Sequence, residues 1–161
     1  MKTFQLVDKD YEMWWTILHM RRTMRKVRAK ELFRYRITPE EAAVLFVVQA
    51  AGPRVTPAEI SRWILREPHS TFGLLQRMEK KGLVRKAKDL ERKNLVRVLL
   101  TEKGREAYAK SDERISIHKV MSSLSEEEQE QLRTLLDRLW SRALEELGIE
   151  FKPPFLNAAQ R

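Results

Sequence analysis

Two helix starts of the same type, a short distance apart, limit the folds that this chain can adopt. Residues 38–41 (TPEE) and 56–59 (TPAE) each place a capping threonine before a proline and a glutamate three residues after the threonine. Gly52 lies between the two starts and is typical of a helix end. The sequence therefore predicts one helix that runs to Ala51 and a second, short helix over residues 57–66, whose apolar stripe comprises Ile60, Ile64 and Leu65.

A third helix follows, and the hydrophobic period then changes. Pro68 opens a segment, predicted to end near Lys81, in which four residues recur three and four positions apart and should face the core: Thr71, Leu74, Leu75 and Met78. From residue 83 the period becomes twofold, which predicts a β-hairpin of residues 83–88 and 95–100. Helix, helix, turn, helix and hairpin is the order of a winged helix-turn-helix, which we place at residues 38–100.

Long helical segments flank this unit. No Gly or Pro occurs from about Asp8 to Phe33, and Thr101 and Ser125 are both expected to cap helices. The chain of 161 residues has the length of one ordinary domain. The expected fold is mainly α with a small β-hairpin, in a single domain over residues 1–161.

The charge balance favours a polyanionic partner. Lys and Arg number 32 against 23 Asp and Glu, and the excess is concentrated in residues 19–36 and 77–97. Charge alone does not distinguish DNA from RNA or anionic lipid. Five bases of the first segment cannot all share one helix face, so some should be solvated or paired with acids of the C-terminal helices: Arg21, Arg22, Arg25, Lys26 and Arg28.

Composition also excludes several kinds of site. The absence of cysteine excludes disulfides, thiolate metal ligands and thiol redox sensing. The longest strongly apolar run, residues 42–48, is too short to cross a membrane, and the N-terminus has no apolar targeting segment. We therefore expect a cytoplasmic protein with no membrane partner.

The outer face of the helix predicted over residues 68–81 is the candidate DNA-reading surface. If its apolar residues face the core, the side chains that project outward are His69, Ser70, Gly73, Gln76 and Arg77. An amphipathic helix by itself is more often structural, but the hairpin that follows favours nucleic-acid binding. The hairpin tip adds Arg92 and Lys93, whereas we interpret Lys80 and Lys81 as cations that complement the C-terminal end of the helix.

Residues 74–84 (LLQRMEKKGLV) and 89–104 (DLERKNLVRVLLTEKG) resemble the MarR-type winged helix-turn-helix transcription regulators. Members typically have a helix that ends in a Leu-Glu-Lys-Lys-Gly-Leu-Val-like segment, then Asp, a basic wing, alternating valines and Leu-Thr-x-x-Gly. This chain departs from the pattern at residues 92–94, where Asp-Arg-Arg is common, and at Gly73, where Arg is frequent. The resemblance implies that Arg92 and Lys93 reach the minor groove or its flanking phosphates.

The resemblance also implies a homodimer. In the family the first helix and the last two interlock across a twofold axis, which makes residues 8–34 and 102–161 the expected helical dimerisation region. The candidate dimerisation residues are Trp14, Leu132, Leu136, Leu139 and Trp140, with Trp15 beside them, and burial within one chain is the alternative. In such a dimer the two copies of the helix over residues 68–81, the reader helices, would lie one DNA turn apart, roughly 34 Å. This spacing requires double-stranded DNA with a pseudo-palindromic operator.

Family members commonly repress genes and release DNA when a small, often phenolic or apolar, ligand binds between the two regions. Four aromatic residues could line such a pocket, although aromatics at this spacing more often belong to the core: Trp14, Trp15, Phe46 and Trp63. The function that we predict is a sequence-specific dimeric DNA-binding transcription regulator, a repressor released by a small-molecule effector. The alternatives are a winged-helix protein-interaction module and a non-specific architectural DNA-binding protein.

An enzyme finds little support in the sequence. The three histidines, His19, His69 and His118, are dispersed, and the chain has neither a nucleophile motif nor a phosphate-binding glycine loop. We expect no catalytic residues, no metal site and no cofactor.

Overall fold

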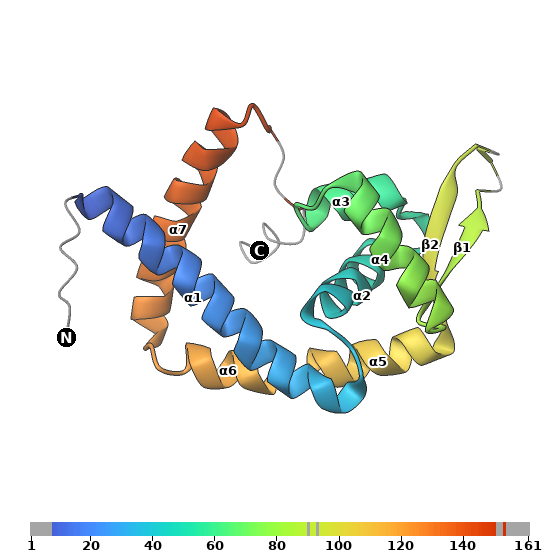
Figure 1. Cartoon of the computed structure of the whole chain (residues 1–161), viewed down its shortest axis with the longest axis horizontal. Helices are drawn as coiled ribbons and strands as arrows, with labels where there is room; N and C mark the ends of the chain where they lie inside the picture. Colours follow the sequence, from blue (N-terminus) through green and yellow to red (C-terminus); the bar gives the residue numbers. More distant parts are fainter. Residues whose placement is uncertain (1–7, 90, 93, 151–152, 154–161) are drawn as a thin grey trace.

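Helices make up most of the chain, and one two-stranded sheet interrupts them (Figure 1). The structure is a computed structural model and describes residues 8–89, 91–92, 94–150 and 153. Its elements in chain order are α1 (Lys9–Leu32), η1 (Phe33–Tyr35), α2 (Pro39–Ala51), η2 (Gly52–Arg54), α3 (Pro57–Trp63), α4 (Pro68–Lys80), β1 (Val84–Lys88), β2 (Val96–Leu100), α5 (Glu102–Asp112), α6 (Ile115–Met121) and α7 (Glu126–Glu146). The predicted fold class, mainly α with a small β-hairpin, is confirmed.

The predicted helix starts form as capped turns. Thr38 Oγ1 accepts the backbone N–H of Glu41 (3.2 Å), and the Glu41 carboxylate accepts the backbone N–H of Thr38 (2.9 Å). The same reciprocal pair begins α3 at Thr56 and α7 at Ser125. Each box satisfies two N–H groups that the first turn of a helix leaves unpaired, so the local sequence fixes where these helices begin.

Two left-handed residues change the predicted boundaries. The prediction for the short helix over residues 57–66 was wrong at its end, because α3 stops at Trp63 and Leu65 adopts φ +49°. Leu65 is 58% exposed and so does not extend the apolar stripe. Arg114, with φ +51°, separates α5 from α6, a break that the sequence analysis did not identify.

The core lies among α2, α3, α4 and the hairpin. Its fully buried side chains include Val44, Leu45, Ile60, Leu75 and Met78. β1 and β2 pair antiparallel from Val84 opposite Leu100 to Lys88 opposite Val96. The backbone N–H of Val98 also bonds the carbonyl of Val55 (3.0 Å), which fastens the hairpin to the segment before α3.

The remaining helices, α1, α5, α6 and α7, lie below and beside this core in the view of Figure 1. In Figure 1 the hairpin lies at the right, α5 and α6 run along the lower edge, and α1 and α7 occupy the left. Of the residues of α1, only Glu31 and Leu32 at its C-terminal end are buried, and in α7 Leu144 alone is buried. Both helices therefore leave most of their length outside the core of a single chain. Among the described residues, no helix combines the length and apolar character that crossing a membrane requires.

Candidate nucleic-acid interface

Helix α4 presents one face to the core and the opposite face to solvent. The four residues predicted to face inward are all buried: Thr71, Leu74, Leu75 and Met78. Of the predicted outward residues, His69, Gln76 and Arg77 are exposed, and Ser70 and Gly73 are half-buried. The orientation predicted for this helix is therefore confirmed, and its donors and acceptors are available to a ligand in solution.

Phe72 lies on the same helix and was missed by the sequence analysis. Its side chain is 52% exposed, although it directly follows the buried Thr71. The ammonium of Lys86 on β1 lies 4.7 Å from the centre of its ring. A helical projection of α4 could have identified Phe72, because it lies about 100° from Thr71 of the buried stripe and therefore at the edge of the exposed face.

The wing tip is organised by Asp89. Its Oδ1 accepts the backbone N–H groups of Glu91 (2.9 Å) and Arg92 (2.7 Å), and its Oδ2 pairs with Arg97 Nε (2.6 Å). The guanidinium of Arg97 also donates to the carbonyl of Arg54. The Arg92 N–H bond and then the Arg97 bond lower the pKa of Asp89 to about 2. The carboxylate thus stays charged at neutral pH and holds the turn that carries Arg92.

Arg92 is exposed at this turn, as the sequence analysis expected of a wing residue. Lys93, the second predicted wing contact, lies outside the described residues, as does most of the segment 151–161 that ends the predicted helical region.

The far end of α4 is tied to α2 by an ion pair. Lys81 Nζ lies 2.7 Å from Glu41 Oε1 and 3.3 Å from the carbonyl of Arg36. Glu41 is 3% exposed and also caps α2. The interpretation of Lys81 as a structural cation is supported, but the partners that the structure shows are the buried Glu41 carboxylate and the Arg36 carbonyl. This contact joins the C-terminal end of α4 to the start of α2.

The basic run of α1 is partly neutralised within the chain. Arg25 pairs with Glu40 at the start of α2 (2.7 Å), and Arg28 pairs with Glu31 of its own helix (2.6 Å). The run was expected to be solvated or paired with acids of the C-terminal helices. Exposed side chains are found at Arg21, Arg22 and Lys26, whereas the acids that pair with Arg25 and Arg28 lie on α2 and on α1 itself. Glu40 is within reach of Arg25 because α1 packs against α2.

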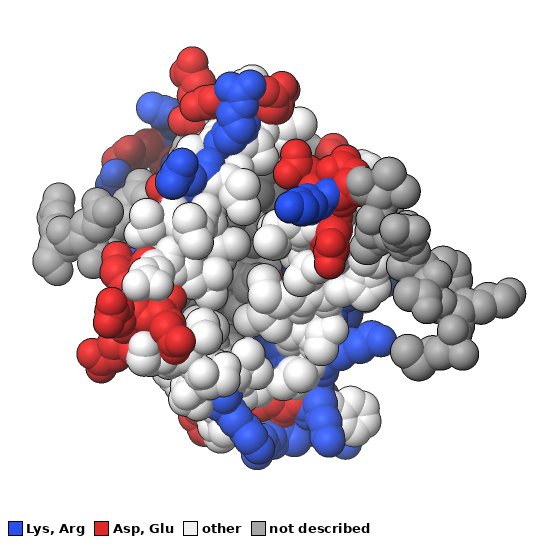
Figure 2. Space-filling model, turned by 90° about the vertical axis from the view of Figure 1, so that its left-hand side faces the viewer, with Lys and Arg blue, Asp and Glu red and all other residues white. Residues whose placement is uncertain are grey.

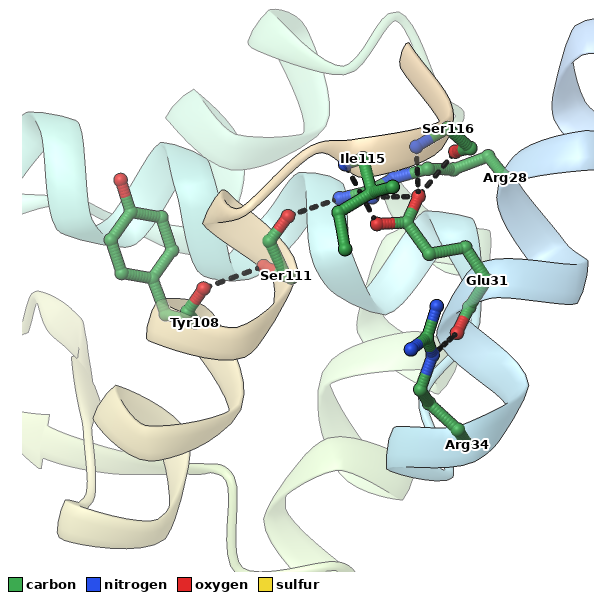
Figure 3. Close-up of polar contacts among 7 residues, drawn as sticks. All are labelled: Arg28, Glu31, Arg34, Tyr108, Ser111, Ile115 and Ser116. Atoms are coloured by element: carbon green, nitrogen blue, oxygen red, sulfur yellow. Dashed lines mark hydrogen bonds and ion pairs between the residues drawn. The ribbon is translucent and has the colours of Figure 1, made fainter. Parts of the chain in front are cut away.

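Glu31 connects α1 to the junction of α5 and α6 (Figure 3). Its carboxylate accepts the backbone N–H groups of Ile115 (3.0 Å) and Ser116 (3.1 Å) as well as the hydroxyl of Ser116. Arg28 bridges the carboxylate and the carbonyl of Ser111 (2.5 Å). Burial alone would raise the pKa of Glu31, but the bonds from Ser116 and Arg28 outweigh it and lower that pKa to about 2.

The predicted dimerisation residues lie on the two helices outside the core. On α1, Trp14 is 62% exposed; on α7, Leu139 is 54% and Leu136 is 37% exposed, and Leu132 and Trp140 are half-buried. The alternative of burial within one chain therefore fails for Trp14 and Leu139. No described group of three or more His, Cys, Asp or Glu side chains is arranged to hold a metal ion.

The four aromatics suggested as pocket residues are not brought together. Phe46 and Trp63 pack against the core, whereas Trp14 and Trp15 lie on α1. A recess on the described surface has a volume of about 530 Å³ and is lined by residues of α1: Trp15, Thr16, His19, Met20, Thr23 and Met24. Trp15 is thus the one member of the four that lines it.

Comparisons with known proteins agree with this arrangement. The profile of the MarR family matches residues 37–93, the segment that contains α2, α3, α4 and β1. The organohalide-sensing transcriptional regulator RdhR-CbdbA1625, bound to 2,4-dichlorophenol, is 28% identical with a TM-score of 0.84, over 95% of this chain and 92% of that chain. Residues 37–93 of the chain thus resemble the MarR family, and the fold is that of a winged-helix transcription regulator, as the sequence indicated.

Two further structures extend the comparison. The ligand-free form of RdhR-CbdbA1625 is 29% identical with a TM-score of 0.80, over 89% of this chain and 86% of that chain. A mutant MarR from E. coli complexed with operator DNA is 19% identical with a TM-score of 0.75, over 84% of this chain and 99% of that chain. The second likeness shows a shared fold. A search of curated protein sequences finds no match.

Proposed function

We propose that this protein is a homodimeric transcription regulator that binds a pseudo-palindromic DNA operator through α4 and the β1–β2 wing. One observation carries the proposal: α4 buries an apolar stripe, exposes polar and basic side chains opposite it, and is followed by a wing whose tip holds Arg92 outward. A helix of this kind enters the major groove, and the wing lies over an adjacent groove. The structural likeness to a MarR mutant complexed with operator DNA supports the same function.

The dimer part of the proposal rests on the apolar face of α1 and α7. Figure 2 views the end of the molecule that these helices occupy, and its centre is largely free of charged residues, which gather toward the rim. Large apolar side chains are exposed on both helices: Tyr11, Met13, Trp14, Trp15, Leu135, Leu136, Leu139 and Leu147. A monomer seldom exposes so much apolar surface in one region, and a second copy of the chain would cover it. Residues 8–34 and 102–161 would then form the dimerisation region, and residues 38–100 the DNA-binding region.

We propose further that the regulator is a repressor and that a small ligand releases it from DNA. RdhR-CbdbA1625 has been solved with bound 2,4-dichlorophenol, and the α1 recess has the volume of a small-molecule site. Trp15 and His19 both line the recess and pack against each other, with ring centres 4.7 Å apart, so an aromatic ligand would contact the outer surfaces of these two rings. Such a ligand would release DNA if it prefers a dimer whose reader helices are wrongly spaced.

The test of DNA binding is selection of fragments by the purified full-length protein from a random and a genomic DNA pool. Recovery of an inverted repeat supports the proposal. Salt-sensitive binding without sequence preference indicates a non-specific architectural protein instead, and no binding indicates a winged-helix protein-interaction module.

The effector is tested on the selected operator with 2,4-dichlorophenol as the probe. Concentration-dependent release of the operator, together with quenching of tryptophan fluorescence, supports release by a ligand of this class. Unchanged operator affinity at saturating probe, or release that persists in a Trp15→Leu, His19→Leu double variant, contradicts the assignment to the α1 recess. Phe33→Leu, outside both the recess lining and the apolar face of α1 and α7, is the control variant.

A further inference from the structure

Phe72 is an apolar side chain on the surface of α4 that is not packed into the core. It is 52% exposed, and the burial of α4 is complete without it, through Thr71, Leu74, Leu75 and Met78. Its position is the second turn of the helix, one turn before Gln76. In a helix-turn-helix the N-terminal part of the second helix is the part that approaches base edges.

The ring is held on the side of α4 that faces the wing. Lys86 on β1 places its ammonium 4.7 Å from the ring centre, an arrangement in which the cation is attracted to the aromatic face. The contact restricts the ring before any partner binds, so less conformational entropy is lost when it makes a contact. A DNA strand that passes between the reader helix and the wing would run beside this ring.

Glu79, the acid of α4, does not prevent the approach of DNA. Its carboxylate accepts the backbone N–H of Lys86 (3.2 Å) and lies 3.6 Å from the Lys86 ammonium. The Lys86 ammonium therefore partly offsets the charge of this carboxylate. The exposed bases of α4, Arg77 and Lys80, keep the reading surface positive.

We propose that Phe72 is a specificity-determining residue that selects thymine at one position of each operator half-site, through contact of its ring with the thymine methyl group. In the major groove, thymine is distinguished by its C5-methyl group, and an apolar side chain recognises that methyl by excluding water from it. Phe72 carries no hydrogen-bonding group, so the methyl is the feature of a base edge that it recognises. The inference rests on the proposed function, since it needs an operator bound by α4.

The test combines a methyl deletion in the DNA with a ring deletion in the protein. Each thymine of the selected operator is replaced in turn by uracil, and dissociation constants are measured for the wild type and for Phe72→Ala. For the wild type, one symmetry-related pair of positions should weaken binding about fourfold per methyl, the value that burial of one such group implies. For Phe72→Ala, the same replacement should have no effect.

Two further variants distinguish the loss of a DNA contact from a disturbance of the fold. Phe72→Gln keeps a long side chain and should also lose the response to uracil, with an unchanged circular dichroism spectrum. Phe33→Ala removes an 82% exposed ring at the end of α1 and should respond to uracil as the wild type does.

Two results would overturn the inference. A methyl effect that survives in both Phe72 variants assigns thymine recognition to another residue, and no methyl effect in the wild type shows that the ring reads no thymine. Either result leaves operator binding intact. Failure to select any preferred sequence is a different result, because it contradicts the proposed function and removes the basis of the inference with it.

Discussion

The carboxylate of Glu31 on α1 accepts hydrogen bonds from both the backbone N–H (3.1 Å) and the hydroxyl of Ser116, 85 residues further along the chain. Through this contact a side chain of the first helix caps α6, whose preceding residue, Arg114, provides no capping side chain. The contact joins α1 to the junction of α5 and α6 (Figure 3), and both α1 and α5 pack against α2. The spacing of two reader helices in a dimer would depend on this joint.

Removal of the Glu31 charge should destabilise the protein. Glu31→Gln weakens the capping bonds and leaves Arg28 without its carboxylate, so we expect a loss of about 2 kcal/mol in the free energy of unfolding at pH 7. Urea denaturation followed by circular dichroism measures this loss.

The difference between wild type and Glu31→Gln should also depend on pH. The pKa of Glu31 is lowered in the folded state to about 2 from its ordinary value of 4.5, so its stabilisation is present above pH 4.5 and is lost as the pH falls toward 2. The two unfolding curves should therefore converge in acid, and a difference that is constant from pH 7 to pH 3 would contradict this account. Glu146→Gln, an exposed acid near the end of α7, is the control and should change stability by less than about 0.5 kcal/mol.

Two glycines should respond in opposite ways to the same substitution. At Gly104 a Cβ atom would lie 1.9 Å from the carbonyl oxygen of Leu83, so Gly104→Ala should separate α5 from the hairpin at a cost of about 1–3 kcal/mol. At Gly73 the nearest atom is the flexible end of Arg77, at 3.6 Å, so Gly73→Ala should stabilise α4 by about 0.5–1 kcal/mol. Thermal unfolding of both variants checks the pair, and equal melting temperatures would refute the packing described at Gly104.

A charge on the apolar face of α7 should prevent dimerisation. Leu139 is 54% exposed in one chain, so Leu139→Asp leaves the core intact but would bury an unpaired carboxylate between two chains. Sedimentation velocity should show a monomer, or a dimer at least about tenfold weaker, for this variant. Thr134→Asp places the same charge on the opposite, exposed face of α7 and should remain dimeric. If Leu139→Asp forms a dimer as strong as that of the wild type, this face is not the interface.

Arg77 and Arg92 should contribute to DNA binding through charge. Both side chains are exposed, so Arg77→Ala and Arg92→Ala should fold normally, weaken operator binding, and each reduce the slope of log affinity against log salt by about one per lost phosphate contact. Arg133→Ala, an exposed arginine of α7, should leave both quantities unchanged. If all three variants bind with the wild-type slope, neither arginine contacts phosphate.

The elements that short-range signals define could be predicted from the sequence. Capping boxes at Thr38, Thr56 and Ser125 depend on residues three positions apart, and the structure forms all three. The inward face of α4 also follows from spacing alone, because Leu74, Leu75 and Met78 can share one side of a helix.

Features that depend on distant residues could not be predicted. Leu65 and Arg114 adopt left-handed backbone conformations without being Gly or Asn, so no residue type marked the end of α3 or the break after α5. From the sequence alone Glu31 would be expected to be a solvated acid in a basic helix. It is buried and caps the N-terminus of α6 because α6 packs against α1. Asp89 and Lys81 likewise find their partners, Arg97 and Glu41, through the tertiary fold.

The most direct measurement for the central claim is titration of the wild-type protein with three DNA duplexes: the selected operator, the same operator with one half-site scrambled, and one with both scrambled. A dimer that reads both halves through α4 and the wing should lose at least about a hundredfold in affinity when either half is scrambled, with a steep salt dependence for all three duplexes. Equal affinity for the three duplexes at every salt concentration would contradict sequence-specific recognition by a twofold dimer.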